Sequence, residues 1–126
     1  MVGNSCELKH AILFNNCQVP HFSYVGDSVL GYKVHLGAGV KISNVKIVPG
    51  TVKVEMDGQS LDTGLRKFGA LMGDYAEAGC NAVLNPGTIL GRRSLVYPCT
   101  NWRGVLPADH IAKNKAAIEV VERKQP

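Results

Sequence analysis

The sequence predicts an all-β fold in which short strands and turns repeat along the chain as a single parallel β-helix. Apolar residues recur every five or six positions in one run and every six positions in a second run: Val2, Leu8, Leu13, Val19, Val25, Leu30, Leu36 and Ile42, then Met72, Ala78, Leu84, Leu90, Val96 and Trp102. A glycine directly follows many of these positions, and a small or β-branched residue comes four positions after most of them. A fixed short period decides the fold before any single strand is assigned.

The six-residue period excludes simpler patterns. It matches neither the α-helical turn nor a long alternating strand, but it fits a short strand followed by a turn. Three hexads make one triangular coil of about 18 residues, with the recurring aliphatic residue inward and the adjacent glycine supplying backbone freedom at the turn. About four coils result. The alternative is a small antiparallel sandwich, which would place its turns roughly every 8 to 12 residues.

Two segments depart from the period. Residues 43–71 contain Asp57-Gly58 between two short candidate strands, which predicts an inserted loop with a two-residue hairpin turn. After residue 106 the chain becomes rich in Ala, Lys and Glu, and Asp109 is a suitable N-cap. We therefore expect a β-helix over residues 1–106, with the loop inside it, and a helical tail over residues 107–126.

Composition argues against several classes of protein. The 126 residues are 45% hydrophobic but contain no apolar run long enough for a membrane helix, and the first residues lack the order of a secretory signal. We expect a single cytoplasmic domain. A net charge of +4, with 6% aromatic residues and scattered basic side chains, does not suggest a nucleic-acid binder.

Cysteine and histidine spacing predicts neither disulfides nor a metal site. Cys6, Cys17, Cys80 and Cys99 match neither zinc-ligand spacing nor a dense disulfide framework, so we expect reduced thiols. The four histidines lie one per segment, whereas zinc requires converging ligands: His10, His21, His35 and His110.

Residues 20–44 resemble one segment of the glucosamine-1-phosphate N-acetyltransferases. The family spacing HxxYxGDxxIGxxxNxGAGTxxxN is carried here by His21, Tyr24, Gly26, Asp27, Gly31, Gly37, Ala38, Gly39 and Asn44. The resemblance implies a left-handed β-helix, an exception to the usual right-handed crossover. In that family the β-helix is the C-terminal half of a bifunctional N-acetylglucosamine-1-phosphate uridylyltransferase, and we expect this chain to lack the nucleotidyltransferase domain.

The resemblance implies roles for four residues. His21 is expected to be the general base for the attacking amine, since imidazole titrates near neutral pH. Tyr24 is expected to stabilise the developing oxyanion or to orient the sugar. Lys9, twelve residues before His21, is expected to hold the sugar phosphate from about one coil away, and Asn44 to contact the amino sugar.

Acetyl-CoA is the co-substrate that the resemblance implies, with Ala38 and Cys80 as the expected contacts of the CoA arm. Each candidate also has a purely structural interpretation. A histidine or tyrosine can be held by a hydrogen bond, a lysine can be solvated, an asparagine can form a turn, and small residues suit the coil. Fold and site are not separable at Ala38.

Three departures from the family pattern bear on the substrate. His35 stands where the family commonly has asparagine, which adds a second histidine to the expected substrate site. The usual loop lysine after Asn44 is out of register, with Lys46, Lys53 and Lys67 as candidates to replace it. We expect this protein to lack the coil that would precede Met1, where the family carries an arginine for the sugar phosphate.

These features predict an acetyl-CoA-dependent N-acetyltransferase of an amino-sugar phosphate such as glucosamine-1-phosphate. The resemblance implies a homotrimer with sites between subunits, and we expect the loop over 43–71 to form one wall of that cleft. The alternative is a non-catalytic trimeric β-helix module that binds a sugar nucleotide or a partner. A zinc-dependent β-helix enzyme is a more distant possibility.

Overall fold

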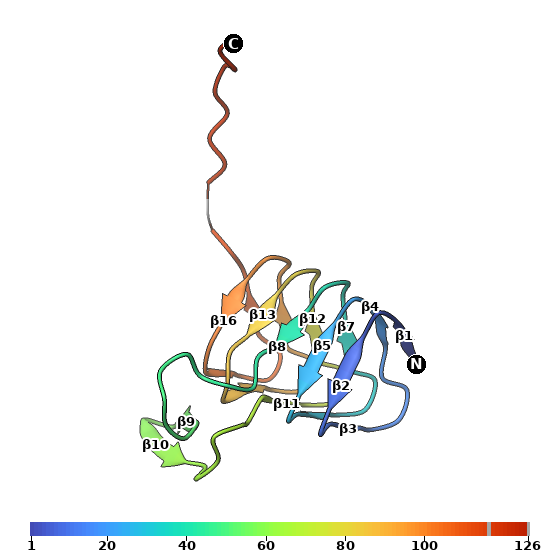
Figure 1. The fold of residues 1–126 in the computed structure, drawn as a ribbon, viewed down its shortest axis with the longest axis vertical. Coiled ribbons are helices and arrows are strands. Elements are labelled where there is room, and N and C mark those ends of the chain that lie inside the picture. Colours follow the sequence, from blue (N-terminus) through green and yellow to red (C-terminus); the bar gives the residue numbers. More distant parts are fainter. Residues whose placement is uncertain (116, 126) are drawn as a thin grey trace.

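The computed structural model describes residues 1–115 and 117–125, and it confirms a left-handed parallel β-helix (Figure 1). Its short strands lie on three faces, named A, B and C. Face A holds β1 (Val2–Asn4), β4 (Val19–His21), β7 (His35–Leu36), β12 (Glu77–Ala78), β15 (Leu95–Val96) and β18 (Ile111–Ala112). Face B holds β2 (Glu7–Lys9), β5 (Tyr24–Gly26), β8 (Lys41–Ile42), β13 (Val83–Leu84) and β16 (Asn101–Trp102). Face C holds β3 (Ile12–Leu13), β6 (Val29–Leu30), β11 (Ala70–Met72), β14 (Thr88–Leu90) and β17 (Val105–Leu106).

The described chain makes five coils and begins a sixth, where the sequence predicted about four. Faces B and C are five-stranded sheets. Face A combines a pair of strands with a four-stranded sheet, joined by the bridge between Gln18 and His35. The run of apolar residues recognised in the sequence ends at Trp102, because Leu106 follows at a spacing of four positions instead of six. The inward column in fact continues through Leu106 to Ala112, which pairs with Val96.

The predicted aliphatic residues form the core. The recurring aliphatic residue of each face points inward and stacks on its equivalents in the neighbouring coils, as Val25, Ile42 and Leu84 do on face B. All three are fully buried. Smaller residues two positions before some of them, such as Val40 and Ala82, are buried in the same core. Parallel ladders join successive coils on every face, so backbone polar groups are satisfied while aliphatic side chains fill the interior.

The glycines after the inward residues are required for a different reason from the one expected. They do not have positive φ; instead, they lie where one coil presses on the next. A Cβ on Gly37 would lie 2.6 Å from the backbone N of Cys80, and one on Gly73 would lie 2.8 Å from the backbone N of Arg92. Backbone atoms in a stacked coil have little room to retreat, so a side chain at these positions conflicts with the stacking itself.

The turns take their left-handed conformation mostly from other residue types. The non-glycine residues with positive φ at the corners are Ser5, His10, Asn16, Phe22, Asp27, Lys33, Tyr75, Asn81, Arg93, Cys99 and Asp109. Asn and Asp tolerate this conformation, whereas a bulky aromatic residue such as Phe22 adopts it at a cost. Coil stacking therefore imposes the corner geometry over local preference.

The inserted loop leaves the stack at the corner between faces B and C (Figure 1). A bridge between Val45 and Lys67 closes its base, and β11 resumes the coil at Ala70, slightly earlier than the predicted end at residue 71. Within the loop, β9 (Lys53–Met56) and β10 (Gln59–Asp62) form an antiparallel hairpin. Asp57 and Gly58 have φ of 52° and 73°, as the predicted two-residue turn requires.

The helix expected over residues 107–126 is absent from the described part of the chain. Residues 107–112 continue the β-helix, and residues 113–115 and 117–125 form no regular structure. Asp109 is a corner residue with φ of 61°, not an N-cap. Ile118 and Val120 are 89% and 90% exposed, so no apolar face packs against the coils. A short helix without such packing is only marginally stable in water. No described segment is a helix long and apolar enough to cross a membrane.

We predict that Ile42→Ala lowers the free energy of unfolding by about 2 to 5 kcal/mol, because it leaves a cavity between two coils. Ile118→Ala removes the same atoms from an exposed site and should change stability by less than about 0.5 kcal/mol. Urea unfolding at one protein concentration measures both variants. Equal losses in the two variants would contradict the assigned core.

Candidate active site

His21, Ala38 and Cys80 lie in one column at the corner between faces A and B. His21 ends β4, Ala38 occupies the equivalent place one coil later, and Cys80 follows one coil after that. The backbone N of Gly39 donates to the carbonyl of His21 at 3.0 Å, and the backbone N of Asn81 donates to that of Ala38 at 2.9 Å. Three residues spread over 59 positions of the sequence therefore form one continuous strip on the surface.

The imidazole of His21 is exposed. Within residues 1–115 and 117–125 its ring makes no hydrogen bond, although its carbonyl accepts one from the Ser23 hydroxyl at 3.2 Å. Both ring nitrogens are therefore open to a ligand. The exposed Phe22, held at φ of 52°, is adjacent to His21 and adds an apolar surface that the sequence analysis did not consider.

Tyr24 and Asn44 are brought together, as two members of one site should be. The Tyr24 hydroxyl donates to Oδ1 of Asn44 at 3.3 Å, and Nδ2 of Asn44 donates to Oδ2 of Asp27 at 2.6 Å. The other Asp27 oxygen lies 3.6 Å from Nδ1 of His10. Because the phenol proton is directed at Asn44, this geometry favours an orienting role for Tyr24 over donation to an oxyanion.

Asn44 also marks the start of the insert. Its side chain is buried, and its carbonyl accepts a hydrogen bond from the backbone N of Phe68 at 2.9 Å, where the chain returns to the stack. Gly26 lies beneath this arrangement: a Cβ there would lie 2.7 Å from the Tyr24 hydroxyl. The Tyr24–Asn44 pair thus depends on the absence of a side chain at Gly26.

Contrary to the sequence prediction, Lys9 does not lie one coil before His21, and His35 lies on a different face from Tyr24. Lys9 pairs with Gly26 on face B, and the residue one coil before His21 is Asn4. Coils in this region repeat every seventeen residues, as Val2 pairs with Val19, so the twelve residues from Lys9 to His21 cover only two faces. His35 lies on face A between Gln18 and Glu77, whereas Tyr24 lies on face B.

Sequence reasoning missed the link from His10 through Asp27 to Asn44. The signal was present, because these three residues are each seventeen positions apart, one coil in this part of the chain. A uniform period of six conceals this relation, because in the first coils two spacings of six and one of five make up the seventeen residues.

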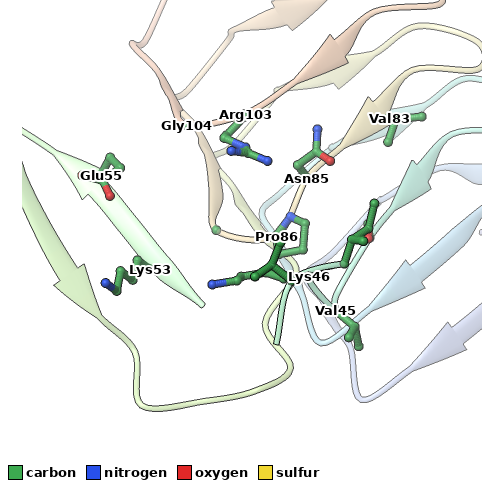
Figure 2. Close-up of a pocket in the computed structure, with 13 residues that line it drawn as sticks. Val45, Lys46, Lys53, Glu55, Val83, Asn85, Pro86, Arg103 and Gly104 are labelled. Atoms are coloured by element: carbon green, nitrogen blue, oxygen red, sulfur yellow. The ribbon is translucent and has the colours of Figure 1, made fainter. Parts of the chain in front are cut away.

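A separate pocket of about 680 Å³ lies between the insert and the later coils (Figure 2). Lys53 and Glu55 of β9 form one wall, and Val83, Asn85 and Arg103 of the coils form the opposite wall. Lys46 extends between them, and its Nζ donates to the carbonyl of Thr51 at 3.1 Å. Lys46 and Lys53, two candidates for the displaced family lysine, therefore line a pocket whose walls include neither His21 nor Tyr24.

In the described part of the chain, no three His, Cys, Asp or Glu side chains form a metal-binding cluster. The described cysteines are free thiols of unequal exposure. Cys80 and Cys99 are exposed, and Cys17 is buried with its Sγ donating to the carbonyl of Gly31 at 3.0 Å. Burial raises the pKa of the Cys17 thiol above its usual range.

Comparison with known proteins finds relatives of the GlmU type. The chain is 37% identical over 97 residues to a bifunctional sugar-1-phosphate nucleotidylyltransferase/acetyltransferase of Sulfurisphaera tokodaii, covering 77% of this chain and 24% of the relative. It is also 37% identical over 95 residues to the bifunctional protein GlmU of Methanococcus maripaludis, covering 75% of this chain and 23% of the relative. The chain resembles the left-handed β-helix acetyltransferase domain of GlmU-type proteins. It spans about a quarter of the length of these curated relatives.

A solved structure supports the fold of this GlmU-like chain. The serine acetyltransferase isoform 3 of Entamoeba histolytica, in complex with cysteine, matches with a TM-score of 0.59. The match covers 95% of this chain and 36% of that one at 11% identity, so the likeness concerns the β-helix alone. No family model matches the sequence.

We predict that iodoacetamide at pH 8 modifies Cys80 and Cys99 before Cys17. A raised pKa leaves less thiolate at that pH, and burial blocks access, so labelling of Cys17 should be slower by on the order of a hundredfold. Peptide mass spectrometry on the native protein measures the order, with protein in guanidinium as the control. Equal native rates would show that Cys17 is not enclosed.

Proposed function

We propose that the chain is an acetyl-CoA-dependent N-acetyltransferase of an amino-sugar phosphate such as glucosamine-1-phosphate, working as a homotrimer. The observation that carries this proposal is the column of His21, Ala38 and Cys80 on the surface of a β-helix that resembles an acetyltransferase domain. In this column the exposed imidazole of His21, which makes no hydrogen bond within the described residues, lies beside the small side chains of Ala38 and Cys80.

In the proposed reaction the amine nitrogen of the sugar attacks the thioester carbonyl carbon. A carbon–nitrogen bond forms while His21 removes a proton from that nitrogen. The carbon–sulfur bond then breaks and His21 returns the proton to the sulfur, so CoA leaves as its thiol. Tyr24, held by Asn44, orients the sugar and is free to accept a hydrogen bond from it. Lys9 contributes a positive charge toward the sugar phosphate from the adjacent face.

The CoA arm is proposed to run along the column from His21 toward Cys80. Successive coils are about 4.8 Å apart, so an extended CoA arm that runs along the column spans the distance between two coils with a few of its bonds. Ala38 and Cys80 are small enough to let such a chain lie close to the backbone of the corner. Phe22 supplies an apolar contact at the His21 end.

The trimer is proposed to bury face C around a threefold axis. The outward residues of this face are all aliphatic and lie in register across five coils: Ile12, Val29, Leu71, Ile89 and Val105. Ile12 is 60% exposed in the single chain, and neighbouring Phe14 is 57% exposed. A continuous apolar ladder on a water-exposed sheet face is typical of a subunit interface.

The insert adjoins face C and is proposed to form a wall of the site in a neighbouring subunit. It emerges at the B/C corner, beside the apolar ladder. Ile47 is 102% exposed and Val48 is 69% exposed, so the insert presents apolar side chains that its own coils do not cover.

We predict that Leu71→Glu converts the trimer to monomers, because it places a charge in the centre of the apolar ladder. Light scattering should then change from about 40 kDa, three times the 13.5 kDa of one chain, to about 13.5 kDa. Ile118→Glu, at an exposed position of the tail, is the control for adding the same charge. A wild-type monomer, or a Leu71→Glu trimer, would contradict the assigned interface.

We predict that His21→Ala lowers kcat for acetyl transfer to glucosamine-1-phosphate by roughly 10²- to 10⁴-fold without changing the assembly, because a general base is lost. Thiol released from acetyl-CoA is measured with a chromogenic disulfide. His110→Ala, an exposed histidine that bonds the carbonyl of Ala108, is the matched control and should retain wild-type turnover.

The same assay distinguishes the enzyme from the non-catalytic trimeric module. If wild-type protein releases no thiol with any amino-sugar phosphate, the non-catalytic trimeric module is the correct interpretation. If thiol is released but His21→Ala retains full turnover, the enzyme assignment holds and the assigned base is wrong.

A further inference from the structure

We propose that the pocket between the insert and coils three to five is a second binding site, for a small ligand that carries a phosphate group on an apolar or planar body. The pocket has a volume of about 680 Å³, within the range of small-molecule sites. Its walls contain none of the residues of the His21 column or of the Tyr24–Asn44 pair. The proposal therefore does not depend on acetyl transfer.

The charge of the walls favours an anion. Lys46, Lys53 and Arg103 line the pocket against a single acid, Glu55, which leaves two positive charges in excess. One Glu55 oxygen is already engaged as an acceptor, because the Ser60 hydroxyl donates to its Oε1 at 2.9 Å. Outside the walls, Asp62 lies opposite Lys53 in the register of the hairpin, so the charge of Lys53 is the one most offset by a nearby carboxylate.

Lys46 and Arg103 are the cations best placed to hold a phosphate. Lys46 is half-buried, and its bond to the carbonyl of Thr51 holds the ammonium group while leaving two N–H donors unused. Arg103 makes no hydrogen bond or ion pair with any residue in 1–115 or 117–125, and its guanidinium lies on the opposite side of the pocket (Figure 2). The planar guanidinium of Arg103 and the ammonium group of Lys46 face the same pocket, and a phosphate can accept hydrogen bonds from both.

The rest of the lining suits an apolar or planar body. Val45, Val83 and Pro86 supply aliphatic surface. Asn85 adds one directional group. Its Nδ2 donates to Oδ1 of Asn101 at 2.5 Å and to the carbonyl of Trp102 at 2.8 Å, so its own Oδ1 remains as an acceptor. A ring that bears an N–H donor matches this wall, and a phosphorylated nucleoside combines such a ring with the required anion.

Uridine 5′-monophosphate is a suitable probe, because CoA contains adenine and no uracil. Isothermal titration of the full chain should show binding of this nucleotide, weaker binding of inorganic phosphate and the weakest binding of uridine. Arg103→Met and Lys46→Met should each weaken nucleotide binding by about ten- to a hundredfold, the usual value of a charged hydrogen bond. Arg66→Met removes one positive charge from the exposed insert outside the pocket, and it should leave the affinity unchanged.

Saturating acetyl-CoA should not displace the nucleotide, and His21→Ala should bind it as wild type does. Absence of nucleotide binding to the folded wild-type protein, as when another subunit occupies the pocket, overturns the proposal. Displacement by acetyl-CoA also overturns it, because the nucleotide would then occupy the CoA site. Equal affinity of Arg103→Met and wild-type protein would place the nucleotide elsewhere, provided that the variant unfolds at the wild-type temperature.

Discussion

Direct stacking of one coil on the next is the constraint on which the rest of this molecule depends. Parallel strands bring each backbone within one hydrogen bond of its equivalents in neighbouring coils, so every position has a fixed partner above and below. The interior accepts the aliphatic side chains that recur on each face. At the glycine positions, where one coil presses on the next, there is almost no room for a side chain. Gly37 and Gly73 are glycines because of that second requirement, since any Cβ there would meet the backbone of the following coil.

Stacking also turns sequence spacing into surface columns. His21, Ala38 and Cys80 become neighbours because each occupies the same corner of successive coils, and the insert between Ala38 and Cys80 does not disturb their alignment. The same rule aligns His10, Asp27 and Asn44. A candidate site on this fold is therefore a strip along the stack, and the corner on which a residue falls matters more than its distance along the chain.

Within the described β-helix the insert is the one part that does not stack on neighbouring coils, and a pocket forms beside it. Its hairpin is supported by its own ladder and by the bridge at its base, while its underside stands away from coils three to five. The resulting pocket combines side chains from the insert with Asn85 and Arg103, which the stack alone would leave as ordinary surface residues. The site at the A/B corner and the pocket near the B/C corner thus arise from different features of one chain.

The tail shows how local sequence preference is overruled. Residues 107–112 contain a good N-cap and precede a helix-favouring composition, yet they form another partial coil, because Leu106 and Ala112 continue the inward column. Beyond Ala112 the described residues have no apolar face against the stack, and helix propensity alone does not order them.

The sequence by itself determined the β-helix, its inward column, the position of the insert and the two-residue turn at Asp57-Gly58, because these follow from periodicity and local turn chemistry. It also identified Tyr24 and Asn44, which lie together, through a resemblance to a family. Only the tertiary structure decided that Lys9 stacks on Gly26 instead of below His21, since the twelve residues between Lys9 and His21 cover two faces of a seventeen-residue coil and not a whole coil. Likewise, only the folded chain brings Lys46 and Arg103 to one pocket, because that contact depends on how the insert folds back over the coils.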